Sequence, residues 1–339
     1  MVKFPIENIA SLFSTIADNC DLFLPQKDGK GVNFKKYTPE CEYDLDTIST
    51  TKSPKSCFFP QIEEIAKFKM EKGKIDIIEN DTKSDSFVIF GVRACDVKSF
   101  DILDRVFLSE PRDPFYKERR ENGIVISLAC NKPNETCFCC VFDINPAEPM
   151  GDISAYINNG FIYFKGITKT GREYLDSLNV SFIPCDEKEL NALKDSITAI
   201  NSKLPLSNLD LSYWKNTDEK TIFNSSKWNE IYKGCLGCGS CTFVCPTCQC
   251  YDVAEFTNGN VSEKYRCWDS CMYSDFTKMA HGNPRKSQKE RFRQRFMHKL
   301  KYFPENNNAI YSCVGCGRCV RSCPQGKNIV KTARSVSDD

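Results

Sequence analysis

The chain contains only 2 His among its 339 residues, beside 21 Cys. So few imidazoles argue against Cys/His zinc modules and leave all-cysteine metal sites as the better alternative. No stretch approaches the run of roughly 18 apolar residues that a membrane-spanning helix needs. The N-terminal segment also lacks the apolar core of a signal peptide, because Glu7 and Asp18 interrupt its apolar spacing. We therefore expect a cytoplasmic chain with no membrane partner.

The overall charge is close to zero, with a net charge of +1. It gives no whole-chain reason to expect a nucleic-acid partner, so any electrostatic steering must come from local patches. Hydrophobic residues make up 41% and charged residues 27% of the chain, which are ordinary values for a globular protein with a sizeable core. The length allows two domains.

The cysteines are concentrated in two groups. Twelve of the 21 lie between Cys235 and Cys323. A smaller group lies in the first half of the chain, at Cys95, Cys130, Cys137, Cys139 and Cys140. A cytoplasmic compartment keeps thiols reduced, so thiolate-bound metal explains this number of cysteines better than a disulfide framework does.

The pattern along the chain predicts an α+β protein. We expect a mixed α/β domain over residues 1–205, a polar linker over 206–227, and an α-helical ferredoxin-type domain with two [4Fe–4S] clusters over 228–339. In the first domain we expect strands at 87–92 and 124–128, a hairpin within 156–164, and helices at 6–16, 97–107 and 187–200. In the second, Phe292, Phe296, Leu300 and Phe303 have the spacing of an amphipathic helix. No strand-like alternation is evident between Cys245 and Cys313, so we expect helices there.

Two cysteine runs near the C-terminus carry the strongest signal. Each has the spacing CxxCxxCxxxCP, and this bacterial ferredoxin pattern uses three closely spaced thiolates for one [4Fe–4S] cluster and the fourth for the other cluster. Glycines within the runs let the backbone approach a cluster closely. The crossed assignment gives one set of Cys235, Cys238, Cys241 and Cys323, and a second set of Cys313, Cys316, Cys319 and Cys245.

Structural zinc is the alternative for these eight cysteines. Two four-thiolate zinc sites could be built from CxxC pairs. Zinc, however, requires neither a third CxxC step nor a CP terminus nor a duplicated pattern, so the spacing favours [4Fe–4S] clusters. The 67 residues between Cys245 and Cys313 are more than a compact ferredoxin of hairpins contains, which points to an α-helical ferredoxin module.

Four further cysteines lie near the first run, at Cys248, Cys250, Cys267 and Cys271. They could tune a cluster, serve as alternative ligands, or fill the core as small apolar side chains. Downstream, residues 284–301 carry eight Lys or Arg against one Glu. This stretch could bind nucleic acid, but its apolar face needs a packed neighbour, so a solvated face or a docking surface for an acidic redox partner fits better.

A third cluster site is possible in the first half. Cys95 follows one predicted strand, and Cys130, Cys137 and Cys139 follow the next one. Loops at neighbouring strand ends commonly build sites, and four thiolates suffice for a [4Fe–4S] cluster. Cys140 is the alternative to Cys139. Zinc, a redox disulfide and unligated thiols remain open from spacing alone.

Several stretches resemble the iron–sulfur β subunit of archaeal sulfhydrogenases, and are similar to the corresponding iron–sulfur chain of anaerobic sulfite reductase. They are GVRACDVKSFDILDRVFL, LACNKPNETCFCC, CLGCGSCTFVCPTCQCYDV, RCWDSCM, GNPRKSQKERFRQRFMHK and CVGCGRCVRSCPQG. The resemblance runs from about Ser53 to Ile329. It implies three [4Fe–4S] clusters, with Cys95, Cys130, Cys137 and Cys139 at the positions of the third. It also places cysteines at Cys248, Cys250 and Cys271, which argues against a role for these three as buried core residues alone.

The resemblance implies an electron-relay subunit of an anaerobic oxidoreductase. Such a subunit works beside a FAD- and NAD(P)H-binding partner of the ferredoxin-reductase type and a catalytic subunit of the sulfite reductase or hydrogenase type. The chain itself has no GxGxxG fingerprint for flavin or nicotinamide, and no acid–base or nucleophile constellation. We therefore expect neither cofactor nor independent substrate chemistry here. The rivals are a zinc-stabilised adaptor or nucleic-acid-binding protein, and an enzyme with a substrate-binding cluster.

Overall fold

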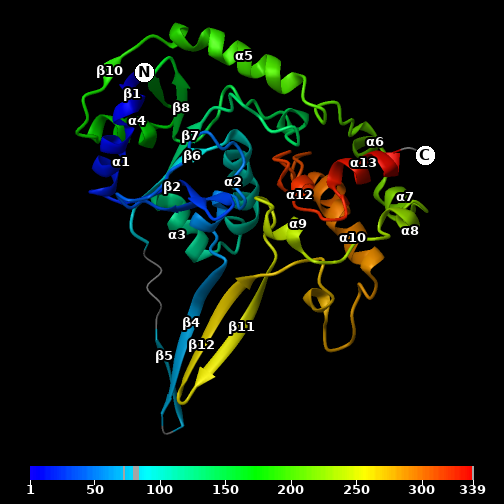
Figure 1. Ribbon diagram of the computed structural model, residues 1–339. Coiled ribbons are helices and arrows are strands. Elements are labelled where there is room, and N and C mark those ends of the chain that lie inside the picture. Colours follow the sequence, from blue (N-terminus) through cyan, green and yellow to red (C-terminus); the bar gives the residue numbers. More distant parts are fainter. Residues whose placement is uncertain (72, 79–83, 338–339) are drawn as a thin grey trace.

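The computed structural model describes residues 1–71, 73–78 and 84–337. It contains two β-sheets and helices gathered mainly in the C-terminal half (Figure 1). The predicted α+β class is confirmed. Among the described residues, no helix is both long and apolar enough to cross a membrane.

The larger sheet has eight strands in the order β10-β1-β9-β8-β7-β6-β2-β3. Its centre is parallel, since β2, β6, β7 and β8 pair in parallel, and its outer pairs are antiparallel. The strands are β1 (Val2–Pro5), β2 (Asp21–Asp28), β3 (Gly31–Lys36), β6 (Phe87–Val92), β7 (Gly123–Leu128), β8 (Ile153–Asn158), β9 (Phe161–Gly166) and β10 (Ile183–Pro184). The predicted strands at 87–92 and 124–128 and the hairpin within 156–164 are confirmed.

Helices cover both faces of this sheet. All six residues of β6 are buried, because its side chains alternate between two apolar clusters. Phe90 packs in the cluster that contains α1, and Ile89 packs in the cluster that contains α2. The helices of this half are α1 (Ile9–Ala17), α2 (Ala94–Phe107), α3 (Pro114–Asn122), α4 (Lys169–Ser177) and α5 (Asn191–Ser202). The three predicted helices are confirmed within a few residues.

The second sheet corrects the prediction that helices alone lie between the two cysteine runs. It has the order β11-β12-β4-β5 and extends away from the body (Figure 1). Its strands are β4 (Ile62–Glu71), β5 (Lys74–Ile78), β11 (Tyr251–Asn258) and β12 (Val261–Trp268). Strand β11 is exposed along nearly its whole length, so it lacks the alternation that marks a half-buried strand. Its partner β12 pairs in turn with β4 of the first half, where Arg266 forms a buried ion pair with Glu63.

The C-terminal half is otherwise helical, as predicted. The amphipathic stretch forms α10 (Gln288–Met297), a π-helical turn (His298–Tyr302) and α11 (Phe303–Asn306). Phe292, Phe296, Leu300 and Phe303 are all buried, and Ser287 with Glu290 closes a capping box at the start of α10. Shorter helices are α8 (Trp228–Ile231), α9 (Ser240–Phe243), α12 (Arg318–Arg321) and α13 (Ile329–Ser337).

The segment 206–227, predicted as a linker, is packed against the C-terminal helices. It contains α6 (Ser212–Asn216) and α7 (Glu219–Asn224). Trp214 is fully buried, and its Nε1 donates a hydrogen bond to the carbonyl of Ala333 at 3.2 Å. The few apolar side chains of segment 206–227 are irregularly spaced among polar ones, so the local sequence pattern did not predict this packing. The proposed division into domains stays a prediction.

Candidate metal centres

The first predicted set of cysteines surrounds one small cavity. Cys235, Cys238 and Cys241 of the first run and Cys323 of the second run all line it. Met272, Phe292 and Arg295 complete its wall. The structure thus brings together, from positions more than eighty residues apart, the four thiols that the crossed spacing rule groups.

The second predicted set surrounds a separate cavity. Cys313, Cys316 and Cys319 line it together with Cys245. Phe138, Arg295 and Lys299 are among its other walls. Burial raises the pKa of the Cys316 thiol to about 12, so this thiol needs a strong electrophile such as a metal to be held as a thiolate.

Left-handed glycines shape the loops that carry the two sets. Gly237 and Gly239 in the first run and Gly315 and Gly317 in the second all have φ between 60° and 73°. The second pair also permits close packing, since a Cβ on Gly315 would collide with the backbone of Phe138, and one on Gly317 with that of Thr136. The second run is therefore seated directly on the loop that carries the third group of cysteines.

The third predicted set lies at the ends of β6 and β7. Cys95 is the second residue of α2, and Cys130 follows β7. Cys139 is close enough to interact electrostatically with Cys130, Cys137 and Cys95. Cys130, Cys137 and Cys139 are buried, whereas Cys140 is half-buried. The structure brings the four predicted thiols together, and Cys140, which is half-buried like Cys95, also lies beside Cys139.

The donor chemistry of the thiol sets fits an iron–sulfur cluster. Each of the first two sets brings four thiols around a cavity, and four thiolates are the donor set of a [4Fe–4S] cluster. Among the described residues, no three Cys, His, Asp or Glu side chains are arranged as a site for a single metal ion.

Three buried cations lie among these thiols, and sequence reasoning missed them. Lys55, Arg295 and Lys299 are each at most 3% exposed. Lys299 Nζ donates to Thr247 Oγ1 at 2.8 Å and to the Ser312 carbonyl at 2.9 Å. Lys55 Nζ donates to the Cys248 carbonyl at 2.7 Å and lies 3.8 Å from the centre of the Trp268 ring. In the part of the chain that the structure describes, none of the three is paired with a carboxylate.

The pKa shifts of Lys55, Lys299 and Arg295 reflect their burial and the thiols around them. Burial lowers the pKa of Lys55 to about 8. Burial also acts to lower the pKa of Lys299, but the nearby thiolates of Cys245, Cys248 and Cys313 raise it above its usual value. For Arg295, burial is likewise outweighed by Cys241 and Cys319, so its pKa rises. The cationic forms of Lys299 and Arg295 are therefore favoured only when the surrounding sulfur atoms carry negative charge.

The extra cysteines adjoin the second set. Cys248 is hydrogen-bonded to Cys245, and this contact is the main cause that lowers the pKa of Cys245 and raises that of Cys248. Cys250 is hydrogen-bonded to Cys271. Cys267 lies apart from them on β12. Three of the four leftover cysteines therefore touch another thiol.

A buried ion pair separates the second and third sets. The Arg318 guanidinium donates to the two carboxylate oxygens of Asp96 at 2.6 and 2.7 Å, and both side chains are 1% exposed. Asp96 follows Cys95, and Arg318 lies between Cys316 and Cys319. A charged residue directly beside a cysteine in each motif was the only sequence signal for it.

The second set is the neighbour of both other sets. Cys241 of the first set interacts electrostatically with Cys319 of the second, and Cys95 of the third interacts with Cys316 of the second. The second set therefore lies between the other two.

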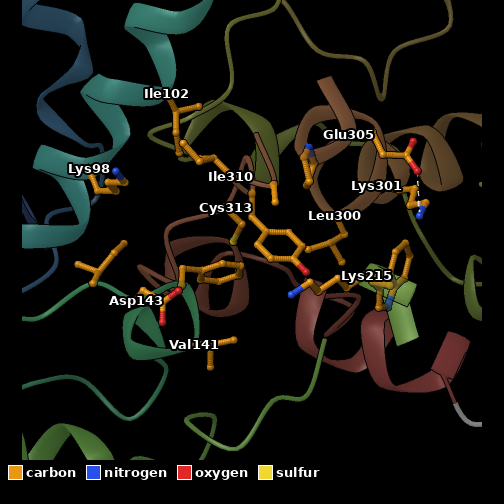
Figure 2. A pocket seen from close by; sticks show the side chains of 16 residues that line it. Lys98, Ile102, Val141, Asp143, Lys215, Leu300, Lys301, Glu305, Ile310 and Cys313 are labelled. Carbon is orange, nitrogen blue, oxygen red and sulfur yellow. Dashed lines mark ion pairs between the residues drawn. The ribbon is translucent and has the colours of Figure 1, made fainter. Parts of the chain in front are cut away.

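A larger cavity of about 510 Å³ opens beside Cys313. Figure 2 shows its lining, to which α2 contributes Lys98 and Ile102, the loop after Cys140 contributes Asp143, and α6 contributes Lys215. The Lys301–Glu305 ion pair, at 2.8 Å, lies on the wall. This cavity had no signature in the sequence.

Comparison with known proteins agrees with this geometry. Residues 234–327 match the family described as "4Fe-4S dicluster domain". The chain is 31% identical over 351 aligned positions to "Sulfhydrogenase 2 subunit beta" of Pyrococcus furiosus, covering 99% of this chain and 98% of that protein. No solved structure matches the chain. A [4Fe–4S]-binding, electron-transferring role is thus supported, and the chain belongs to the family of iron–sulfur β subunits of sulfhydrogenases.

Proposed function

We propose that this chain is the electron relay of a multisubunit oxidoreductase and holds three [4Fe–4S] clusters. When bound, such a cluster takes up and releases single electrons at a potential set by its surroundings. The proposed ligands are four per cluster: Cys235, Cys238, Cys241 and Cys323; Cys245, Cys313, Cys316 and Cys319; and Cys95, Cys130, Cys137 and Cys139.

The observation that carries the proposal is the buried cationic centre around the second set. A buried charge without a partner is strongly destabilising, and Lys55, Arg295 and Lys299 have no carboxylate partner among the described residues. The Nε of Arg295 is buried without any hydrogen-bond partner. Four thiolates around an iron–sulfur core supply the missing negative charge at the right place. Uncharged thiols would leave these cations uncompensated.

The remaining residues of the centre have supporting roles. The cysteine thiolates hold the clusters, and the left-handed glycines let backbone N–H groups approach the sulfur atoms. The buried cations favour the more negative, reduced form and so raise the potential of the central site. Apolar walls such as Phe138, Phe292 and Met272 exclude water.

The partners follow from the family and stay part of the proposal. The relative is a subunit by name, which supports a complex of several chains. We infer a FAD- and NAD(P)H-binding partner of the ferredoxin-reductase type at one end of the relay, and a catalytic subunit of the hydrogenase or sulfite reductase type at the other. No flavin or nicotinamide is assigned to this chain, and its location is proposed to be the cytoplasm.

An anaerobic reductive titration tests the proposal. The purified protein should be brown, with broad absorbance near roughly 400 nm that bleaches on reduction. Electron paramagnetic resonance should then resolve three one-electron centres, and Cys137→Ser should remove one of them. A colourless protein, with zinc in place of iron, would support the zinc-stabilised adaptor instead.

A further inference from the structure

We propose that the surface around Cys238 docks an electron-carrier protein through an acidic face of that protein. The inference rests on the proposed relay function and names where the relay exchanges electrons with a partner. It is carried by three features of this surface: an exposed ligand, an apolar centre, and a rim of lysines.

Cys238 is the exposed member of the twelve proposed ligands, since the other eleven are buried or half-buried. It lies in the loop between α8 and α9, which also contains Leu236, whose side chain is 65% exposed. Direct electron exchange with a second protein requires close approach to a cluster. Of the three sets, the first is therefore the one that presents a proposed ligand on the surface.

Exposed apolar side chains form the centre of the surface. Tyr273 is 37% exposed, its hydroxyl donates to the carbonyl of Cys238 at 3.2 Å, and its ring covers Gly239. Together with Leu236 it borders the exposed thiol on the Cys238 loop. Exposed apolar side chains clustered at one place and framed by polar ones are typical of protein interfaces rather than of nucleic-acid sites.

Lysines lie around this apolar centre and form its rim. Gln288, the first residue of α10, lies against Gly237, and its Nε2 is 3.6 Å from Cys235 Sγ. Lys286 and Lys289 flank it in the chain, and Lys289 Nζ reaches Asn229 Oδ1 at 3.1 Å on α8. On the other side, Lys327 lines the cavity wall beside Cys323.

Three carboxylates lie near this rim: Glu230 on α8 is paired with Lys233 at 2.7 Å, Asp275 follows Tyr273 by two residues, and Glu290 lies on α10. The nearest carboxylate on α10, that of Glu290, accepts hydrogen bonds from Ser287 in the capping box. The chain as a whole has a net charge of only +1, so the rim is a local excess of positive charge. Such an excess speeds the encounter with an oppositely charged protein and orients it on the surface.

Stopped-flow reduction of the anaerobic holoprotein tests the inference. The probe is a reduced, acidic plant-type ferredoxin, and photoreduced deazaflavin serves as a small reductant that needs no docking. The test variant is Lys286→Glu/Lys289→Glu, which changes no proposed ligand. The matched control is Lys30→Glu/Lys169→Glu, an equal charge reversal at exposed positions of the N-terminal half.

We expect the test variant to lose about tenfold in second-order rate with ferredoxin at low ionic strength, because steering by local charge acts on the encounter rate. The loss should vanish at high salt, while the control variant stays within about twofold of the unmodified protein. Equal losses in both variants, or a rate that does not depend on salt, would overturn the inference. So would binding of a short oligonucleotide in competition with ferredoxin.

The deazaflavin arm separates this inference from the proposed function. If deazaflavin reduces the clusters in every variant but ferredoxin shows no preference, the docking surface is wrong and the relay stands. If deazaflavin reduces nothing because no iron is present, the relay itself fails.

Discussion

The eight-stranded sheet and the cysteine-lined centre are stabilised in different ways. In the sheet, β6 buries five apolar side chains between helices on both faces, and burial of apolar surface explains its stability. In the centre, Lys55, Arg295 and Lys299 are buried beside thiols without carboxylate partners among the described residues. The first region is stabilised mainly by its own apolar side chains, whereas we propose that the second needs negative charge from a bound group.

Removing the metal should produce the largest difference in behaviour between the sheet and the cysteine-lined centre. Chelation of iron under denaturant-free, anaerobic conditions leaves the buried cations without compensation, so we expect the centre and its surrounding helices to open. The strands β6, β7 and β8 should remain folded. Hydrogen exchange followed by mass spectrometry measures this directly. If chelation changes hydrogen exchange equally in the sheet and in the cysteine-lined centre, the two regions are not stabilised in different ways.

The Asp96→Asn substitution should have the next largest effect. It leaves Arg318 buried without its charged partner between the second and third sets, and breaking such a pair costs about 3–5 kcal/mol. The free energy of unfolding, measured by anaerobic urea denaturation, checks it. The control is Asp101→Asn, which removes the exposed partner of Lys98 and should cost less than about 1 kcal/mol. Equal losses of unfolding free energy in the two variants would show that the buried Asp96–Arg318 pair stabilises the fold no more than the exposed pair does.

Lys299→Met should lower the potential of the central cluster. A unit charge about 8 Å away, at an effective dielectric constant of about 20, is worth about 2 kcal/mol, or about 90 mV for one electron. Lys301→Met is the matched control on the same helix, because Lys301 is paired with Glu305 and donates to the Thr217 carbonyl. Redox titration followed by electron paramagnetic resonance should show a much smaller shift for it. Equal shifts of the redox potential in the two variants would show that Lys299 has no specific effect on the central cluster.

Cys250→Ser/Cys271→Ser should have the smallest effect on cluster content. These thiols touch each other instead of standing around a cavity, so we expect the iron content to stay at the unmodified level. Cys137→Ser, in contrast, should remove about four iron per chain. Loss of iron from the double variant would show that a ligand set has been assigned wrongly.

Local spacing was enough to predict the thiol groups. Each CxxCxxCxxxCP run places three ligands within one tight loop, and the crossed position of Cys245 and Cys323 follows from the repeat. Cys95 and Cys130 could be grouped because each follows a strand of a parallel pair, whose ends lie at one edge. The apolar spacing of α10 was equally local.

Long-range partners could not be predicted in this way. The β11–β12 hairpin has little buried alternation of its own and is completed by β4 from the first half. Lys55 reaches the Cys248 carbonyl across 193 positions, and Arg318 reaches Asp96 across 222. For Lys55 nothing in the neighbouring sequence marks this contact, and for Arg318 and Asp96 the only sign is that each stands beside a cysteine. The cations that distinguish the central site therefore became visible only once the fold brought them to the thiols.

Metal and sulfide analysis of the anaerobically purified chain tests the central claim most directly. Three four-cysteine sets predict about twelve iron and about twelve acid-labile sulfide per chain, with zinc at trace level. Iron near eight per chain would leave the third set without a cluster. Two or three zinc per chain without labile sulfide would contradict the relay altogether.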